Sequence, residues 1–425
     1  MSFINEISKT IGEDYNESIT ENGAVGYATT QRPLLDLNFK VSSYRNVENE
    51  ADIIREFMPA YADNKILALR WLFFVRDARE GLGERRYFRV IMKELARIDS
   101  DTIKKLLPLF AEYGRYDDLV MLIDSNVGTA VRDIIMYTIT DDLKNMKNNK
   151  PISLLAKWLP SENTSSAETV RLAKSVISKL GVTPKRYRKI LSALRGYLKI
   201  VEKSMSAKEW SEINYEAVPS RANLIYNDAF LRNDESRRRE FLGKVKSGEA
   251  KINAGVLYPH DIVRKYRSKR NSWYSYSALS VDNTLEALWK ALPDTVNGNS
   301  NTIVVADGSG SMSSTIGNTD VQAHDVADAL AIYFAERCSG EFKNKYITFS
   351  SRPQLVSLNG DTLADNLCIA SSHNECSNTN IEAVFNLILT IAIRNKMTQE
   401  EIPQNILIIS DMEFDSATSA DYYNR

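Results

Sequence analysis

The spacing of apolar residues changes once along this chain, close to residue 300, and that change constrains the fold more than any other feature. From about residue 51 to residue 245, apolar residues recur every three or four positions, as in "NKILALRWLFFVRDAREG", which is typical of amphipathic helices. Beyond the change, short apolar runs such as "NTIVVAD" and "QNILIISD" alternate with helical stretches. Uninterrupted apolar strands between helices favour a mainly parallel sheet covered on both faces. The sequence therefore predicts an all-α part followed by an α/β domain.

This pattern divides the chain into three segments. Residues 1–50 are polar and turn-rich, so we expect an extended lead-in with a short apolar anchor at "LLDLNF". Residues 51–285 predict a module of short amphipathic helices joined by short turns, as in stacked helix pairs, although no fixed repeat length is visible. Residues 300–425 predict the α/β domain, with "ALPDTVNGNSN" as the linker. Two or more domains agree with a length of 425 residues, which is too long for one core.

Composition narrows the classes of function. The formal net charge is -1, so binding to nucleic acid would need local basic patches rather than a global field. The chain has 3 cysteines with no CxxC spacing, which argues against a disulfide framework and a zinc site. The N-terminal stretch "MSFINEISKTIGEDYNES" lacks the basic and apolar regions of a signal peptide, and no stretch has the length of a membrane-spanning helix. We therefore expect a cytoplasmic protein without a membrane partner.

The most informative short stretch is "IVVADGSGSMSS", where an apolar strand runs into "DGSGS". No lysine follows, as a Walker A loop requires, and the glycine spacing does not match a dinucleotide-binding loop. Asp307, Ser309 and Ser311 stand at alternate positions at the carboxyl end of the strand, where ligand sites form in open α/β sheets. Their hard oxygen atoms suit Mg²⁺ or Mn²⁺. The alternative is a glycine-serine turn with an aspartate cap.

Two distant residues extend this pattern. Thr379 stands just before a long predicted helix, and Asp411 ends the next predicted strand. The resulting DxSxS…T…D set resembles the metal-ion-dependent adhesion site of von Willebrand factor A domains. The resemblance implies a Rossmann-like α/β fold in which the two serines and the threonine bind the ion directly or through water and the aspartates complete its shell. It also implies further strands beyond Asp411, whereas this sequence stops at Arg425, so we expect an incomplete sheet or an edge that another segment covers.

Two segments combine basic and aromatic residues. The first contains Lys185, Arg186, Arg188 and Lys189. The second contains Arg264, Lys265, Arg267, Lys269 and Arg270, followed by Trp273 and Tyr274. Such mixtures suit phosphate contacts and base stacking on structured or single-stranded RNA. The alternative is a solvated helix face that balances acidic residues elsewhere. The three histidines are far apart, and no catalytic array of the Ser/His/Asp or HExxH type is visible.

A wider resemblance covers nearly the whole chain. The stretches "ISLLAKWLPS", "YPHDIV", "VVADGSGSM" and "SDMEFD" occur in the order typical of the DUF2828 family. That family is similar in layout to TROVE-module (Ro-type) proteins, in which HEAT-like helices bind RNA and a von Willebrand A domain packs beside them. The resemblance implies a HEAT-like helical module followed by a von Willebrand A domain, and by analogy RNA binding.

Three functions remain open. The protein could bind RNA through its helical part, with the metal site holding a partner or stabilising the assembly. It could instead be a protein-interaction module in which an acidic side chain of a partner completes the metal shell. A metal-dependent phosphohydrolase using Asp307 and Asp411 is the third, but no general base or phosphate-binding lysine is apparent beside them. We therefore expect a binding protein rather than an enzyme.

Overall fold

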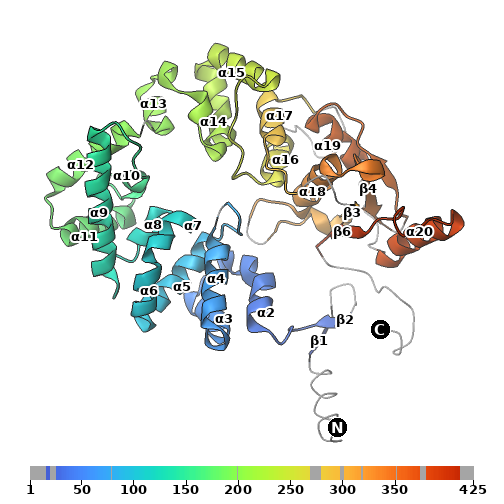
Figure 1. Ribbon diagram of the computed structural model, residues 1–425, viewed down its shortest axis with the longest axis horizontal. Helices are drawn as coiled ribbons and strands as arrows, with labels where there is room; N and C mark the ends of the chain where they lie inside the picture. Colours follow the sequence, from blue (N-terminus) through green and yellow to red (C-terminus); the bar gives the residue numbers. More distant parts are fainter. Residues whose placement is uncertain are drawn as a thin grey trace, which may run out of the picture. The chain divides into compact units, whose positions relative to one another are not determined.

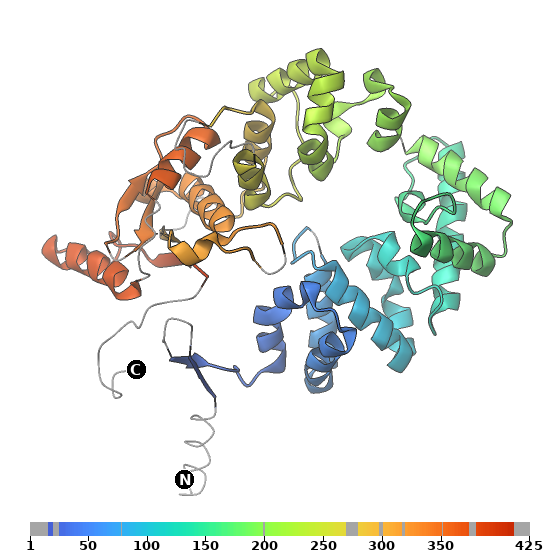
Figure 2. The same ribbon diagram turned by 180° about the vertical axis from the view of Figure 1, so that it is seen from behind.

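The computed structural model describes residues 16–19, 25–77, 79–198, 200–268, 279–296, 301–316, 319–350, 352–373 and 380–411. They form two compact units, the first spanning residues 30–213 and the second combining residues 1–29 with residues 214–425 (Figures 1 and 2). The division at residue 213 lies inside the segment 51–285 for which the sequence predicts one helical module. The helices of residues 214–290 therefore pack with the α/β part in one unit, although the change from helices to strands lies near residue 300.

The unit of residues 30–213 is built from helices around one apolar core. Its α-helices are α2 (Pro33–Lys40), α3 (Glu50–Asp63), α4 (Lys65–Arg76), α5 (Arg85–Ile98), α6 (Ser100–Leu106), α7 (Phe110–Tyr113), α8 (Tyr116–Val120), α9 (Gly128–Lys147), α10 (Leu155–Trp158), α11 (Ala167–Leu180), α12 (Pro184–Tyr197) and α13 (Val201–Ala207). Short 3₁₀ turns join some of them: η1 (Val41–Asn46), η2 (Leu107–Leu109) and η3 (Trp210–Glu212). The expected apolar anchor "LLDLNF" forms α2, so helical structure begins before residue 51.

Local sequence explains where α11 ends and where α12 begins. The Ser166 side chain accepts a hydrogen bond from the Thr169 amide and caps the start of α11. Gly181 follows α11 with φ 64°, a left-handed conformation that favours glycine and ends the helix. Thr183 then caps α12, and Pro184 occupies its first turn, where no amide donor is required. The two helices are therefore joined by a tight corner.

The described part of the second unit begins with two paired strands, followed by one 3₁₀ turn and four α-helices. Strands β1 (Glu17–Ile19) and β2 (Val25–Tyr27) pair antiparallel. The later helical elements are η4 (Tyr215–Ala217), α14 (Ser220–Asn233), α15 (Glu235–Ser247), α16 (Pro259–Arg267) and α17 (Asn283–Lys290). They precede the α/β part, which contains β3 (Thr302–Asp307), η5 (Gly310–Ser313), α18 (Ala323–Arg337), η6 (Gly340–Phe342), β4 (Lys345–Phe349), β5 (Leu355–Ser357), α19 (Leu363–Ser372), α20 (Ile381–Arg394) and β6 (Asn405–Ile409).

Partly buried polar contacts join α17 to the α/β part. The Glu286 carboxylate accepts the amides of Leu363 (3.0 Å) and Ala364 (3.2 Å) at the start of α19. The Trp289 indole donates to the Glu336 carboxylate on α18 at 2.7 Å. Burial raises the pKa of Glu336, although its hydrogen bonds oppose that shift. Because each of these groups needs its partner, α17 packs as part of the α/β core rather than as a linker.

The α/β part contains a mixed sheet of four strands in the order β5-β4-β3-β6. The central strand β3 pairs parallel with β4 on one side and with β6 on the other, and β5 pairs antiparallel with β4. Ile303 and Val305 pack with Val384 of α20 on one face. The alternate residues Val304 and Ala306 are buried as well, and α18 also contacts β3. Figure 1 shows α18 and α20 on opposite sides of the sheet. The predicted combination of an α-helical part with a C-terminal α/β part is confirmed.

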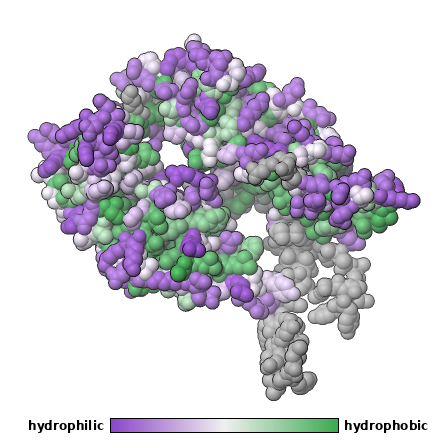
Figure 3. All heavy atoms as spheres, in the orientation of Figure 1, coloured by the Kyte–Doolittle hydropathy of each residue, from purple (hydrophilic) through white to green (hydrophobic). Residues whose placement is uncertain are grey.

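The far side of α20 carries apolar side chains on the surface. Phe385, Leu389 and Ile393 are exposed, and hydrophobic atoms are visible along this helix in Figure 3. Its neighbour β6 is an edge strand of the described sheet. Among the helices that the structure describes, none combines the length and the apolar character needed to cross a membrane.

Candidate functional site

Asp307 is the last residue of the central strand β3. Its side chain is fully buried, and its backbone pairs with Phe349 of β4. The strand ends here because "DGSGS" replaces the apolar run and the chain turns into η5. Since β3, β4 and β6 run parallel, their carboxyl ends meet at this one edge of the sheet.

The two serines after Asp307 fold back toward its carboxylate. The Ser309 amide donates to Asp307 Oδ1 at 2.9 Å, which forms an Asx-type turn. Ser309 Oγ lies 2.9 Å from Ser311 Oγ. The structure therefore brings together the three residues that the sequence predicts as neighbours, one buried carboxylate and two hydroxyl groups.

The residue that follows the adjacent strand β6 supplies a fourth oxygen-bearing side chain. Ala306 pairs with Ile409, the last residue of β6, so the residue after it stands beside Asp307. This residue is Ser410, whose hydroxyl group donates to Asp307 Oδ2 at 2.6 Å. Sequence reasoning missed Ser410, although its place before Asp411 at the end of an apolar run was a usable signal. Asp411 follows directly and is half-buried at the same edge of the sheet.

One predicted ligand is not placed. Thr379 lies outside the described residues. The next residue, Asn380, caps α20 by accepting from the Ala383 amide at 2.9 Å. The position predicted for Thr379, directly before a long helix, therefore agrees with where α20 begins.

The charge of Asp307 has no cationic partner among the described residues. Both oxygen atoms of Asp307 accept from neutral donors, and no cationic side chain in the described ranges pairs with it. A buried carboxylate without a cation is costly in a folded protein. Within those ranges no group of three or more His, Cys, Asp or Glu residues could hold a metal ion, so a site here would depend on hydroxyl oxygens.

The donor set fits Mg²⁺ or Mn²⁺. Carboxylate and hydroxyl oxygens are the hard ligands that Mg²⁺ prefers. An octahedral shell with bonds of about 2.05 Å places adjacent ligand atoms about 2.9 Å apart. Ser309 Oγ and Ser311 Oγ are separated by 2.9 Å, a distance that equally suits a hydrogen bond between them.

The basic residues of α16 are paired within the protein. Arg264 forms an ion pair with Asp320, and Lys265 Nζ lies 3.7 Å from Asp228. Arg267 Nη1 lies 2.7 Å from Asp325 Oδ1 on α18.

Arg267 also pairs with Asp328, and its side chain is only 17% exposed. Burial lowers its pKa, but the carboxylates of Asp328 and Asp325 outweigh burial and raise that pKa. Its guanidinium group therefore joins α16 to α18 and is not presented to a ligand. The remaining predicted residues of this segment, Lys269, Arg270, Trp273 and Tyr274, lie outside the described residues.

The basic residues of α12 are arranged differently. Lys185, Arg186, Arg188 and Lys189 are all exposed along the first turns of this helix. Arg188 pairs with Glu162, whereas the other three form no ion pair with another described residue. This segment belongs to the unit of residues 30–213 and the α16 segment to the other unit.

Comparisons with known proteins find two family models that match separate parts of this chain. Residues 130–301 match the family model "Domain of unknown function (DUF2828)", and residues 301–424 match "Domain of unknown function (DUF7788)". The resemblance to DUF2828 is therefore confirmed over residues 130–301, whereas the stretches "VVADGSGSM" and "SDMEFD" lie within the second match. The two matches meet directly before β3. A similar protein is "Uncharacterized protein L728" of Acanthamoeba polyphaga mimivirus, 28% identical over 437 residues that cover 94% of this chain and 73% of that protein.

Proposed function

We propose that this is a cytoplasmic, non-enzymatic binding protein whose α/β domain is of the von Willebrand A type and binds a divalent cation. The observation that carries the proposal is Asp307, a fully buried carboxylate at the end of the central parallel strand that has only neutral partners in the described part of the chain. A bound cation would supply the missing charge.

The chain's own residues define what the site could hold. Asp307, Ser309 and Ser311 would ligate the ion directly or through water, and Thr379 and Asp411 would complete the set. Mg²⁺ or Mn²⁺ would supply an electrophilic centre for an anionic oxygen. Because at most two protein carboxylates take part, they would at most neutralise the ion, which would stay electrophilic and could accept an acidic side chain of a partner protein in place of a water.

Cation binding is tested by titrating Mn²⁺ into the metal-free protein with calorimetry and by following thermal unfolding in Mg²⁺. We expect one Mn²⁺ per chain in wild type and none in Asp307→Asn. At a Mg²⁺ concentration about 100 times its Kd, the wild type should gain about 2.7 kcal/mol of unfolding free energy. The control is Asp133→Asn, which removes a carboxylate that is 62% exposed and should leave binding unchanged.

The two parts of the proposal fail separately. Equal Mn²⁺ binding by wild type and Asp307→Asn would refute the cation site. If the cation binds, protein recovered from expressing cells without crosslinking should release its protein partner with EDTA, and Asp307→Asn should capture none. Retention of the same partner in both cases would refute the acidic-ligand role while leaving the cation site intact.

RNA binding is a second candidate, favoured by the exposed face of α12. Lys185, Arg186 and Lys189 pair with no other described residue, so all three charges could contact phosphate groups. Arg188 shares this face but is already paired with Glu162. The α16 segment offers less, because Arg264, Lys265 and Arg267 all contact carboxylates within the protein.

The RNA candidate is tested by fluorescence anisotropy with a single-stranded RNA at several salt concentrations. Replacing Lys185, Arg186 and Lys189 by Ala should weaken binding and reduce the slope of log K against log salt by about 2, since each phosphate contact contributes about 0.7.

A matched control removes the same charge elsewhere in this unit, with Arg97, Lys104 and Arg132 replaced by Ala. Each of these residues already pairs with a carboxylate on its own helix. Equal losses in the two triple variants would show that the effect is general charge and would contradict a binding face on α12.

A further inference from the structure

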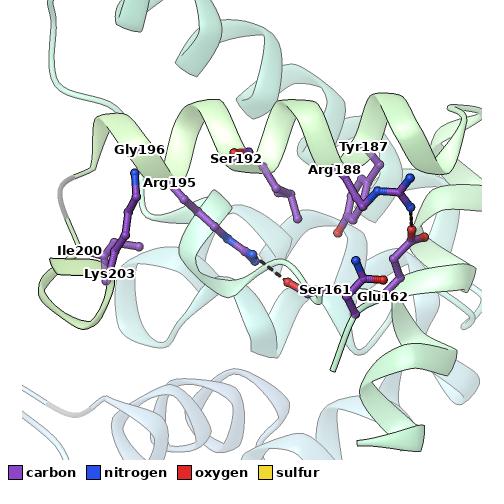
Figure 4. Close-up of a pocket in the computed structure, with 11 residues that line it drawn as sticks. Ser161, Glu162, Tyr187, Arg188, Ser192, Arg195, Gly196, Ile200 and Lys203 are labelled. Carbon is purple, nitrogen blue, oxygen red and sulfur yellow. Dashed lines mark hydrogen bonds and ion pairs between the residues drawn. The ribbon is translucent and has the colours of Figure 1, made fainter. Parts of the chain in front are cut away.

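A cavity of about 380 Å³ lies beside α12, separate from the cation site. Tyr187, Leu191 and Ile200 contribute apolar walls, and the loop at Ser161 and Glu162 closes one side (Figure 4). The volume is at the lower end of the range for small-molecule sites. It exceeds what a bare inorganic anion fills.

Arg195 is held in the cavity wall by three hydrogen bonds, and no carboxylate of a described residue pairs with it. Its guanidinium group donates to Ala156 O (2.8 Å), Leu159 O (2.7 Å) and Ser161 Oγ (2.7 Å). These three bonds use three of its five N–H groups, and no described residue accepts from the other two. Burial lowers the pKa of Arg195, because desolvation penalises its charge.

The cavity carries more positive than negative charge. Besides Arg195, it is lined by Arg188, which pairs with Glu162, and by Lys203, which pairs with no described carboxylate. Figure 4 shows Arg195 between Arg188 at one end and Lys203 at the other. A Cβ at Gly196 would meet Lys203 Nζ at 3.4 Å, so glycine leaves space for this ammonium group beside the helix. Three cations and one carboxylate leave two positive charges to be matched.

We propose that this cavity binds a small organic phosphate, with the phosphate group between Arg195 and Lys203 and the rest of the molecule against the apolar walls. A phosphate group carries up to two negative charges at neutral pH and accepts hydrogen bonds from planar guanidinium groups. The same group could be presented by a free phosphorylated metabolite or by the end of an RNA chain. This inference does not depend on the cation site.

The experiment measures displacement of a fluorescent derivative of AMP from the full chain. We expect AMP to compete and adenosine to fail, because the phosphate group supplies the recognised charge. Lys203→Met keeps the aliphatic stem and should weaken AMP at least 10-fold. Ser192→Trp keeps every cation but fills the cavity and should weaken AMP as strongly. The control Lys174→Met removes an exposed lysine of α11 and should change nothing.

Two further competitors separate the possible sources of the phosphate group. A 5′-phosphorylated RNA dodecamer that competes better than AMP, and better than its unphosphorylated form, identifies an RNA end. AMP or glucose 6-phosphate competing better than the RNA identifies a free metabolite. Binding that is absent at millimolar AMP, glucose 6-phosphate and RNA would overturn the proposal, and so would binding that Lys203→Met and Ser192→Trp leave unchanged. Circular dichroism of both variants establishes that they are folded.

Discussion

Replacing Arg267 should weaken the attachment of α16 to α18 rather than remove a ligand contact. Its guanidinium group bridges Asp325 and Asp328, whose side chains are 5% and 2% exposed. Arg267→Met keeps part of the aliphatic stem but takes the guanidinium charge away from two buried carboxylates. Breaking a buried ion pair by removing one partner costs about 3–5 kcal/mol. We expect a loss in this range, confined to the unit that contains α16.

Amide hydrogen exchange with mass spectrometry measures this loss locally. A loss of about 3–5 kcal/mol corresponds to exchange that is roughly 140- to 3700-fold faster, because each 1.4 kcal/mol is about a factor of ten. The faster exchange should appear in peptides from α16 and α18. Peptides from α4 and α5, in the other compact unit, serve as an internal reference.

A matched variant on the same helix separates buried from exposed pairing. Arg264 is 33% exposed and its partner Asp320 is 81% exposed, so Arg264→Met should cost no more than about 1 kcal/mol. Equal exchange in the two variants would refute the argument from burial. A second check is the variant in which Arg267→Met is combined with Asp325→Asn and Asp328→Asn. It should recover part of the stability, because no unpaired charge remains.

Three more predictions concern stability. Asp118→Ala removes a fully buried carboxylate that lies 2.7 Å from Arg76, so the free energy of unfolding measured in urea should fall by about 3–5 kcal/mol. A fall of less than about 1 kcal/mol would contradict the importance of this buried ion pair. Burial lowers the pKa of His260 below its usual 6.5. The unfolded chain therefore binds a proton first, and the folded protein should lose stability as pH falls through 6.5 toward the lowered pKa. Melting temperatures of His260→Gln should depend less on pH over this range than those of wild type. Gly81→Ala would place a Cβ 1.9 Å from the Phe74 carbonyl oxygen, so calorimetry should show destabilisation of at least about 1–3 kcal/mol, and an unchanged melting temperature would show that the loop relaxes freely.

Local patterns predict the strands of the α/β part better than its other features. The runs "NTIVVAD" and "QNILIISD" contain β3 and β6, because a strand buried on both faces needs uninterrupted apolar residues. The helix α19 was not singled out, although Thr362 and Asp365 form a capping box at its start. The antiparallel direction of β5 could not be predicted, because strand direction depends on how the connection returns to the sheet.

Long-range pairing explains where sequence reasoning about charge is weakest. In the sequence Arg267 stands in a basic, aromatic segment and looks like a phosphate contact. Its carboxylate partners lie 58 and 61 residues further along the chain, so no local pattern reveals them. The same holds for Glu286, whose hydrogen bonds to the start of α19 span 77 and 78 residues. Basic composition therefore indicates binding surfaces only after such internal partners are known.

The hydrogen bonds of Asp307 would serve a structural turn as well as a cation site, whereas its negative charge serves only a cation site. The hydrogen bond from the Ser309 amide to Oδ1 is what an Asx turn requires, and asparagine would accept it equally well. The second oxygen, Oδ2, accepts from Ser410 and could also be accommodated by an amide if the hydroxyl group reversed its role. A structural turn therefore has no need of a negative charge, and burying one there costs stability. If Asp307 serves only the turn, metal-free Asp307→Asn should be at least as stable as wild type and Mg²⁺ should change neither protein. If it serves a cation, Asp307→Asn should be the more stable protein without Mg²⁺ and the less stable one with it, and this reversal is the result that a turn alone does not produce.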